Sequence, residues 1–326
     1  LVFGLIEGRT YGWWLVNKQF ILGDFEWSKT GISPIPISLA ISVVATILFV
    51  LWEKRRAALQ KSVLLDLDLF KIVSFRNGSI AAMIISMGEF GVIFALPLWL
   101  QNVVGLSPIS SGLVLLWLAG GAFLASGIGG ALSGKLPPAR AVQLGVLLEL
   151  IGVVGVGIFA SVGTGWGPIA PLLFIYGIGV GLATAQLTGV IMVDVPNEQA
   201  GQASGSQSTV RQVGSALGIA VLGTMLFTGV QSSLETRLAD FKDSGITDTV
   251  STQIVDGVVD SAGGFIPAIS GTLQKFGTPA ALADDVQTAA GDAFTDGAKA
   301  ASWAAAGFLA LGLLSTLRLG ARRVKK

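Results

Sequence analysis

The 326-residue sequence contains no cysteine and no histidine, and only 13% of its residues are charged. The absence of both residue types excludes disulfides, thiol nucleophiles, Ser-His or Cys-His catalysis and His-bearing metal sites. The formal net charge of +1 gives no electrostatic basis for binding nucleic acid. We therefore expect no enzyme activity, no cofactor and no metal, and any proton chemistry must be carried out by a carboxylate.

Hydrophobic residues make up 52% of the chain, and the mean hydropathy is +0.73. Ordinary soluble domains carry about 25% charged residues, roughly twice the share found here. The charges that are present cluster between long apolar runs. The composition thus predicts an all-α polytopic membrane protein embedded in a lipid bilayer.

The apolar runs define the expected organisation, since about 20 apolar residues suffice to cross a bilayer as a helix. Residues 1–6 are apolar but too short to span, so we expect a truncated transmembrane helix there and read the chain as a fragment. Residues 7–52 are expected to form an external loop with one accessory span, 53–78 a cytoplasmic linker, and 79–326 a six-helix bundle that includes an external loop at 231–298. The expected spans are 33–52, 79–101, 109–134, 141–161, 168–193, 207–228 and 299–319.

Two connecting segments leave alternatives open. The linker stretch LLDLDLFKIVSF mixes apolar and charged residues, which fits a segment lying on the membrane surface as well as a plain solvated linker. The loop 231–298 is too polar to cross the bilayer. Its Thr278-Pro279 pair is typical of a helix start, so we expect this loop to be partly helical.

The stretch 167–227 holds two long apolar runs joined by the polar turn 194–206. We expect the two helices to be antiparallel neighbours because the turn is short. Gly177 and Gly181 in the first run, and Gly214 and Gly218 in the second, are spaced four apart, and such small-residue faces let helices approach closely in lipid.

The segment VDVPNEQAGQASGSQSTVRQVGSALGIAVLG, residues 193–223, resembles the late cytoplasmic hairpin of the major facilitator superfamily, and more narrowly its fourteen-span drug:proton antiporter branch. Residues 65–70, LDLDLF, are similar to a stretch that precedes the C-terminal bundle in that branch. The resemblance implies the C-terminal half of such a protein: a six-helix bundle of inverted three-helix repeats, one complete accessory span and a helix stub. Its partner would be the missing N-terminal half of the same transporter.

The same resemblance implies export of amphipathic or cationic compounds, that is multidrug efflux, in exchange for protons across a bacterial cell membrane. A symporter or lipid exporter of the same fold is the alternative within transport. A non-transporting membrane scaffold or a truncated remnant is the alternative from another class.

Orientation follows from the basic residues, which are enriched in cytoplasmic segments. With the RRVKK tail inside, fourteen of the 21 Lys and Arg residues fall on the inner side and seven on the outer side. We therefore expect a cytoplasmic C-terminus.

Two acidic residues, Glu89 and Glu149, fall well inside predicted spans. Carboxyl groups at this depth are costly when charged, so each is a candidate proton-coupling site. Ala82, Ser86 and Ile93 share the helical face of Glu89, and Pro97 follows. A carboxyl group kept for structure alone is the alternative at both positions.

Candidate substrate-lining residues are mainly aromatic. Trp117 lies eight residues inside its span, where its indole could contact a cationic ligand through a cation–π interaction. A core or lipid-facing ring is the alternative. The further candidates are Phe90, Phe94, Tyr176 and Gln186.

Residues 130–140, GALSGKLPPAR, resemble the superfamily's cytoplasmic loop motif, which implies a gating role for Lys135 and Arg140. The motif's acidic residue is absent, with Gly134 near its place. Arg211 and Asp194, at the cytoplasmic ends of consecutive runs, form the better candidate gating pair. Structural anchoring is the alternative for both.

Overall fold

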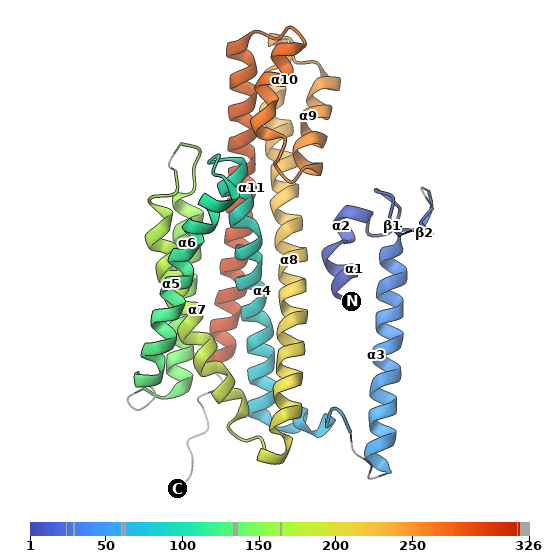
Figure 1. Ribbon diagram of the computed structural model, residues 1–326, viewed down its shortest axis with the longest axis vertical. Helices are drawn as coiled ribbons and strands as arrows, with labels where there is room; N and C mark the ends of the chain where they lie inside the picture. Colours follow the sequence, from blue (N-terminus) through green and yellow to red (C-terminus); the bar gives the residue numbers. More distant parts are fainter. Residues whose placement is uncertain are drawn as a thin grey trace.

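The computed structural model describes residues 1–23, 25–28, 30–59, 61, 63–132, 136–163, 165–317 and 319. Within these residues the chain is almost entirely helical, and seven helices are long and apolar enough to cross a membrane (Figure 1). The structure therefore confirms the predicted all-helical, multi-span membrane fold.

The elements follow one another along the chain with short connections. In order they are α1 (Val2–Ile6), α2 (Gly8–Tyr11), β1 (Ile21–Leu22), β2 (Phe25–Glu26), α3 (Pro34–Ala58), η1 (Leu67–Lys71), α4 (Val73–Asn102), α5 (Pro108–Leu132), α6 (Pro138–Phe159), α7 (Ile169–Met192), η2 (Asn197–Gln199), α8 (Ala200–Ala239), η3 (Lys242–Ser244), α9 (Asp248–Asp260), η4 (Ile266–Ala268), α10 (Ile269–Lys275) and α11 (Ala280–Thr316).

Six of the long helices form one bundle with a regular pattern of contacts. Helix α4 packs on α8 and α11, while α7 packs on α5 and α6, and the two groups meet where α11 contacts α6 and α4 contacts α7. Exchanging α4, α5 and α6 for α7, α8 and α11 preserves these contacts. The extensive contact between α8 and α11, however, has no comparable counterpart between the described residues of α5 and α6, so the inverted three-helix repeats stay a prediction.

Two spans are much longer than predicted. Helix α8 begins at Ala200 and ends at Ala239, whereas the prediction was 207–228, and α11 begins at Ala280 rather than at Lys299. Hydropathy marks only the part of a helix that lies in lipid. The polar turns beyond that part are helical as well, because a helix satisfies its own backbone hydrogen bonds whatever surrounds it.

The extensions of α8 and α11 carry a helical cap at one end of the bundle (Figure 1). Helix α9 packs on α8, and α10 packs on α11. Arg237 of α8 joins the two extensions, with its guanidinium 2.9 Å from Asp296 and 3.5 Å from Asp292 of α11. The expectation of a partly helical segment at 231–298 is confirmed.

The glycine faces allow close approach, but between helices other than those expected. Side chains at Gly214 and Gly218 would collide with the backbone of Met83 and Met87 on α4, and a side chain at Gly177 would collide with Leu118 on α5. Helices α7 and α8 contact each other only slightly. The expected antiparallel α7–α8 pairing was therefore wrong, because each helix buries its small-residue face against a helix of another hairpin.

The linker between α3 and α4 is bound to the bundle by specific hydrogen bonds. Gln199 donates to the Asp66 carboxylate at 2.8 Å, and Gln202 both donates to the Val63 carbonyl and accepts from the Asp66 amide. Glu53, buried near the end of α3, accepts from the Leu64 amide at 3.1 Å. A plain solvated linker does not describe a segment held in this way, and a position on the membrane surface stays a prediction.

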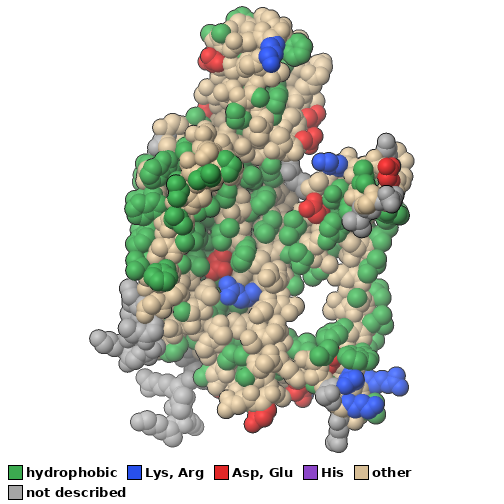
Figure 2. All heavy atoms as spheres, viewed as in Figure 1, with side chains coloured by type: hydrophobic (Ala, Val, Ile, Leu, Met, Phe, Trp, Pro, Cys, Tyr) green, Lys and Arg blue, Asp and Glu red, His purple; other side chains and the backbone are tan. Residues whose placement is uncertain are grey.

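Helix α3 stands apart from the bundle, and most of its length is exposed. Figure 2 shows hydrophobic side chains over the middle of the molecule and charged side chains mainly toward its two ends. This distribution is typical of a protein whose middle lies in lipid.

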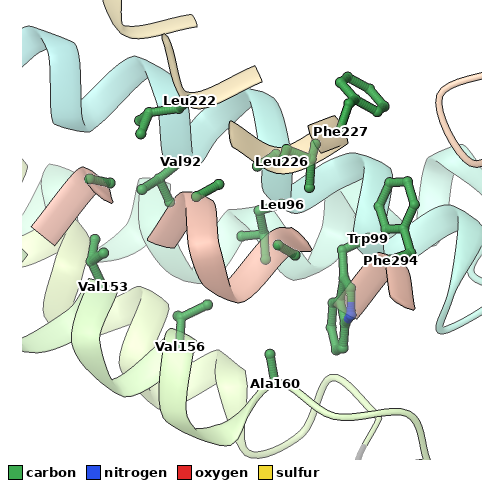
Figure 3. Packing of buried hydrophobic residues seen from close by; sticks show 14 of the residues in the cluster. Val92, Leu96, Trp99, Val153, Val156, Ala160, Leu222, Leu226, Phe227 and Phe294 are labelled. Carbon is green, nitrogen blue, oxygen red and sulfur yellow. The ribbon is translucent and has the colours of Figure 1, made fainter. Parts of the chain in front are cut away.

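The bundle interior is filled by apolar side chains from α4, α6, α8 and α11 (Figure 3). Trp99 is fully enclosed there, and its indole nitrogen donates to the Thr295 hydroxyl at 3.0 Å. This packed layer lies closer to the cap than Glu89 does, because Val92, Leu96 and Trp99 all follow Glu89 along α4. A polar site at Glu89 is therefore separated from the cap by a layer of apolar side chains.

Candidate functional site

Glu89 lies near the middle of α4, sixteen residues after Val73 and thirteen before Asn102. At about 1.5 Å per residue, these separations correspond to about 24 and 20 Å. The residue is only 3% exposed. Its predicted depth near the centre of the span agrees with this placement.

The partner of Glu89 is Arg211 on α8. The Arg211 Nη2 atom donates to Glu89 Oε2 at 3.5 Å, and its Nε donates to the Ser86 hydroxyl at 3.4 Å. Ser86 and Glu89 are three residues apart, so one guanidinium meets both on the same face of α4. The fork of donors on arginine fits this double contact better than a lysine ammonium would.

The expected pairing of Arg211 with Asp194 was wrong. Asp194 is exposed just after α7, and the carboxylate within ion-pair distance of Arg211 in the described part of the chain is that of Glu89. The reason is the early start of α8 at Ala200. That start places Arg211 about 17 Å from the helix beginning, instead of one turn from it.

The two members of the ion pair differ in exposure. The Arg211 side chain is 29% exposed, while the Glu89 side chain is almost fully covered. The guanidinium is therefore the more accessible member of the pair.

Glu149 on α6 is 0% exposed, and neither of its carboxylate oxygens has a hydrogen-bond partner in the described structure. It lies where α6 and α7 approach most closely. A side chain at Gly179 would come within 2.8 Å of the Glu149 Cγ atom. Glu149 and Glu89 are also close enough to interact electrostatically with each other and with Arg211.

The predicted substrate-lining residues do not form one site. Trp117 is 47% exposed on α5, where its ring meets Phe174 edge-on at 6.3 Å. Phe94 lines a pocket of about 180 Å³ between the α1–α2 segment and helices α4 and α8. Gln186 donates to the Gly129 carbonyl at 3.1 Å, and Phe90 is partly buried.

Tyr176 was expected to line a substrate path, but its side chain is 1% exposed and closed off from any open space. Its hydroxyl donates to the main-chain carbonyl of Glu89 at 3.4 Å. The physical reason is that α7 packs its Tyr176 face onto α6 and α4. Ile93, expected to share the buried face of Glu89, is instead 41% exposed.

The two basic residues of the cytoplasmic loop motif have different outcomes. Lys135 lies outside the described residues. Arg140 is exposed in the first turn of α6, and its proposed gating role remains a prediction.

Sequence reasoning missed the amides that hold the linker, Gln199 and Gln202, and a second contact in which Gln207 of α8 donates to Thr188 of α7 at 3.2 Å. The available signal was the repeated glutamine in NEQAGQASGSQ, at positions that face the preceding hairpin. Amide side chains in a turn are usually solvated, and only the folded linker supplies their partners.

The fold and the buried charge pair define a multi-span helical membrane protein. The family model of the Major Facilitator Superfamily matches residues 19–219, which is more than half of the chain. The chain therefore belongs to the Major Facilitator Superfamily.

Relatives with known names agree with this assignment. The chain is 30% identical over 281 residues to the tetracenomycin C resistance and export protein of Streptomyces glaucescens, covering 84% of this chain and 48% of that protein. It is 28% identical over 274 residues to the multidrug resistance protein Stp of Mycobacterium tuberculosis, with coverages of 82% and 46%. It is 32% identical over 247 residues to the drug efflux pump JefA of the same organism, with coverages of 74% and 47%. The chain spans about half the length of these relatives.

Proposed function

We propose that this chain takes part in the export of amphipathic, often cationic compounds across a bacterial cell membrane, in exchange for protons. The observation that carries the proposal is the Glu89–Arg211 pair, a buried carboxylate near the middle of α4 with a partly exposed guanidinium 3.5 Å away. The names of the relatives, which refer to drug resistance and export, support the substrate class.

The pair provides a way to exchange a proton for a positive charge. When Glu89 is ionised, Arg211 compensates its charge in a region of low dielectric, where such interactions are strong, and Ser86 accepts a hydrogen bond from the same guanidinium. When Glu89 binds a proton, the attraction is lost, and the guanidinium is free to move toward the open side. Proton binding and ion pairing thus exclude each other.

A cationic substrate acts on the same carboxylate. Its charge favours the ionised form of Glu89 and expels the proton, while a proton arriving from outside displaces the substrate. Trp117, Phe90 and Phe94 are the proposed aromatic contacts for such compounds, and the exposed face of Trp117 is open to a cation. The covered Tyr176 and the hydrogen-bonded Gln186 are assigned no direct contact.

Orientation is part of the proposal. The α3–α4 linker and the α7–α8 turn lie at the end of the bundle opposite the cap (Figure 1). We place the linker, the turn and the C-terminus in the cytoplasm and the cap outside, because the basic residues are concentrated on the linker and the C-terminus. The assignment to the fourteen-span branch and to its C-terminal half remains a prediction from the resemblance.

The experiment is a proton-release assay in inverted membrane vesicles carrying the protein. Respiration first acidifies the vesicle interior, and a cationic dye such as ethidium is then added together with a pH-sensitive probe. Coupled exchange predicts that ethidium partly collapses the pH gradient and accumulates inside, and that an uncoupler abolishes accumulation. Accumulation that is unaffected by the uncoupler would contradict proton exchange, and no accumulation of any amphipathic cation tested would contradict the substrate class.

A further inference from the structure

Tyr176 occupies a position between the two buried carboxyl groups. It is one of two tyrosines in the chain. On one side, its hydroxyl donates to the Glu89 carbonyl at 3.4 Å and so contacts the turn of α4 that carries the Glu89 side chain. This contact joins α7 to α4 at the level of the ion pair.

On the other side, Tyr176 lies against the α6 turn that carries Glu149. A side chain at Gly152, three residues after Glu149, would come within 2.6 Å of the Tyr176 Cβ atom. Gly179, three residues after Tyr176, lies against Glu149 itself, with a Cβ position 2.5 Å from the Glu149 amide nitrogen. The backbones of α6 and α7 therefore approach closely on both sides of these two residues.

The carboxyl group of Glu149 lacks hydrogen-bond partners in the described structure. Both of its oxygens are buried without a hydrogen-bond partner, and an ionised carboxylate in that state is strongly unfavourable. Protonation removes this charge and its desolvation cost. The Tyr176 hydroxyl is within electrostatic range of both the Glu149 and the Glu89 carboxyl groups.

The charged groups around this unit come from four helices: Glu89 from α4, Glu149 from α6, Tyr176 from α7 and Arg211 from α8. Helix α11 approaches the same level with Ala305 and Leu309, which lie against Gly88. Helix α5 meets the neighbouring turns of α7 with Leu118 and Ala122. Within the described residues, the charged groups that act on Glu149 are Glu89 and Arg211, and the charged group that acts on Glu89 is Arg211.

We propose that Tyr176 is a positioning residue that joins Glu89 and Glu149 into one proton-handling unit. Its hydroxyl fixes the Glu89 turn of α4, and its close backbone contact fixes the Glu149 turn of α6. A change of protonation at one carboxyl group then changes the electrostatic potential at the other, because the distance between the two groups is fixed. This inference rests on the proposed function and adds a second proton site and the residue that connects the two.

The test replaces Tyr176 with phenylalanine, which keeps the ring and removes only the hydroxyl. Tyr11→Phe is the matched control, because Tyr11 lies in the short helix α2, away from both carboxyl groups. Dye-induced proton release is measured in vesicles over a range of pH. The loss of one hydrogen bond predicts a reduction of about two- to tenfold and a displaced pH profile for Tyr176→Phe, with an unchanged profile for Tyr11→Phe.

A double-mutant cycle with Glu149→Gln separates this role from simple packing. If Tyr176 acts by connecting the two carboxyl groups, Tyr176→Phe has little further effect once Glu149 is glutamine. Effects of the two substitutions that multiply independently would overturn the inference, as would a Tyr176→Phe profile identical to that of the unaltered protein.

A second readout does not depend on transport. Infrared spectroscopy of the purified protein follows the protonated carboxyl bands, which Glu89→Gln and Glu149→Gln assign. The inference predicts that Tyr176→Phe changes the pH at which these bands appear, and unchanged titration would overturn it. Absence of any coupled exchange in the unaltered protein would refute the proposed function instead, so the two failures are distinguishable.

Discussion

The Arg211 guanidinium on α8 lies 3.5 Å from the Glu89 carboxylate on α4, although 122 residues separate the two along the chain. At this buried position, the charge of either residue would be uncompensated without the other. Removing one member leaves the other buried without compensation, which is more costly than removing both.

The first prediction concerns this difference between removing one member of the ion pair and removing both. Arg211→Ala is expected to abolish proton-coupled export, and Arg211→Lys to retain part of it, since lysine keeps the charge but not the forked donor geometry. Combined with Glu89→Gln, the effects on protein stability should be non-additive by about 0.5–3 kcal/mol. Thermal unfolding of the purified variants measures the coupling.

Asp194→Asn is the control for the pair, because Asp194 is exposed after α7. It should behave like the unaltered protein and add independently to Arg211→Ala. Additive effects of Arg211→Ala and Glu89→Gln, together with coupling of Arg211 to Asp194, would contradict the observed pairing.

The second prediction tests the glycine contact between α4 and α8. A side chain at Gly218 would collide with the Met87 backbone, whereas nothing lies within 4 Å of a Cβ at Gly205 in the same helix. Gly218→Ala should therefore destabilise the protein by about 1–3 kcal/mol. Gly205→Ala should be neutral or slightly stabilising, because alanine is the better helix former. The melting temperature is measured as the temperature at which half of the heated protein is lost from the folded peak in size-exclusion chromatography. Equal melting temperatures for the two variants would show that α4 and α8 do not approach as closely as described.

The third prediction concerns the linker. Asp66 accepts from Gln199 and from the amide of Asp68, so Asp66→Ala removes two hydrogen bonds, each worth about 0.5–1.5 kcal/mol. The linker should then be cut faster by chymotrypsin near Leu69 and Phe70. Asp68→Ala is the control, because its ion pair with Lys71 is exposed and exposed pairs contribute little. A cleavage rate that responds equally to both changes would mean that the linker is not held by the α7–α8 turn.

Much of this architecture could be predicted from the sequence, for identifiable physical reasons. The seven spans follow from apolar runs, since lipid tolerates few other compositions. The helix start near Thr278-Pro279 follows from local backbone chemistry, and α11 begins one residue later. Each of these features depends on residues close together in the chain.

The predictions that were wrong share a different cause. A glycine face shows that some helix approaches closely, but not which one, and the short turn between α7 and α8 led to the wrong expectation that these two helices pack together. Arg211 was paired with Asp194 because the apolar run begins at Gln207, while α8 begins seven residues earlier. Tyr176 was predicted to line the substrate pathway because an aromatic residue inside a span has the same local sequence pattern whether its ring faces a substrate pathway or the packed core. Partner choice between distant segments is set by the packing of the whole bundle.

The fourth prediction concerns orientation. The chain has no native cysteine, so single cysteines can be introduced without a background. Ser244 is exposed in the cap and Ser204 is exposed near the start of α8. In intact cells, an impermeant thiol reagent should label Ser244→Cys and not Ser204→Cys. The opposite pattern would invert the proposed topology.

The central claim is that Glu89 exchanges a proton for a positive charge, and one measurement tests it most directly. Dye uptake and collapse of the pH gradient are followed together in inverted vesicles carrying Glu89→Gln, with Glu198→Gln as control because Glu198 is an exposed carboxylate in the α7–α8 turn. The account predicts that Glu89→Gln reaches the membrane in normal amounts but no longer releases protons when a monovalent cationic dye is added. Glu149→Gln should have a smaller or substrate-dependent effect, and Glu198→Gln none. Normal coupled exchange by Glu89→Gln would show that this carboxylate is structural and that the proton is carried elsewhere.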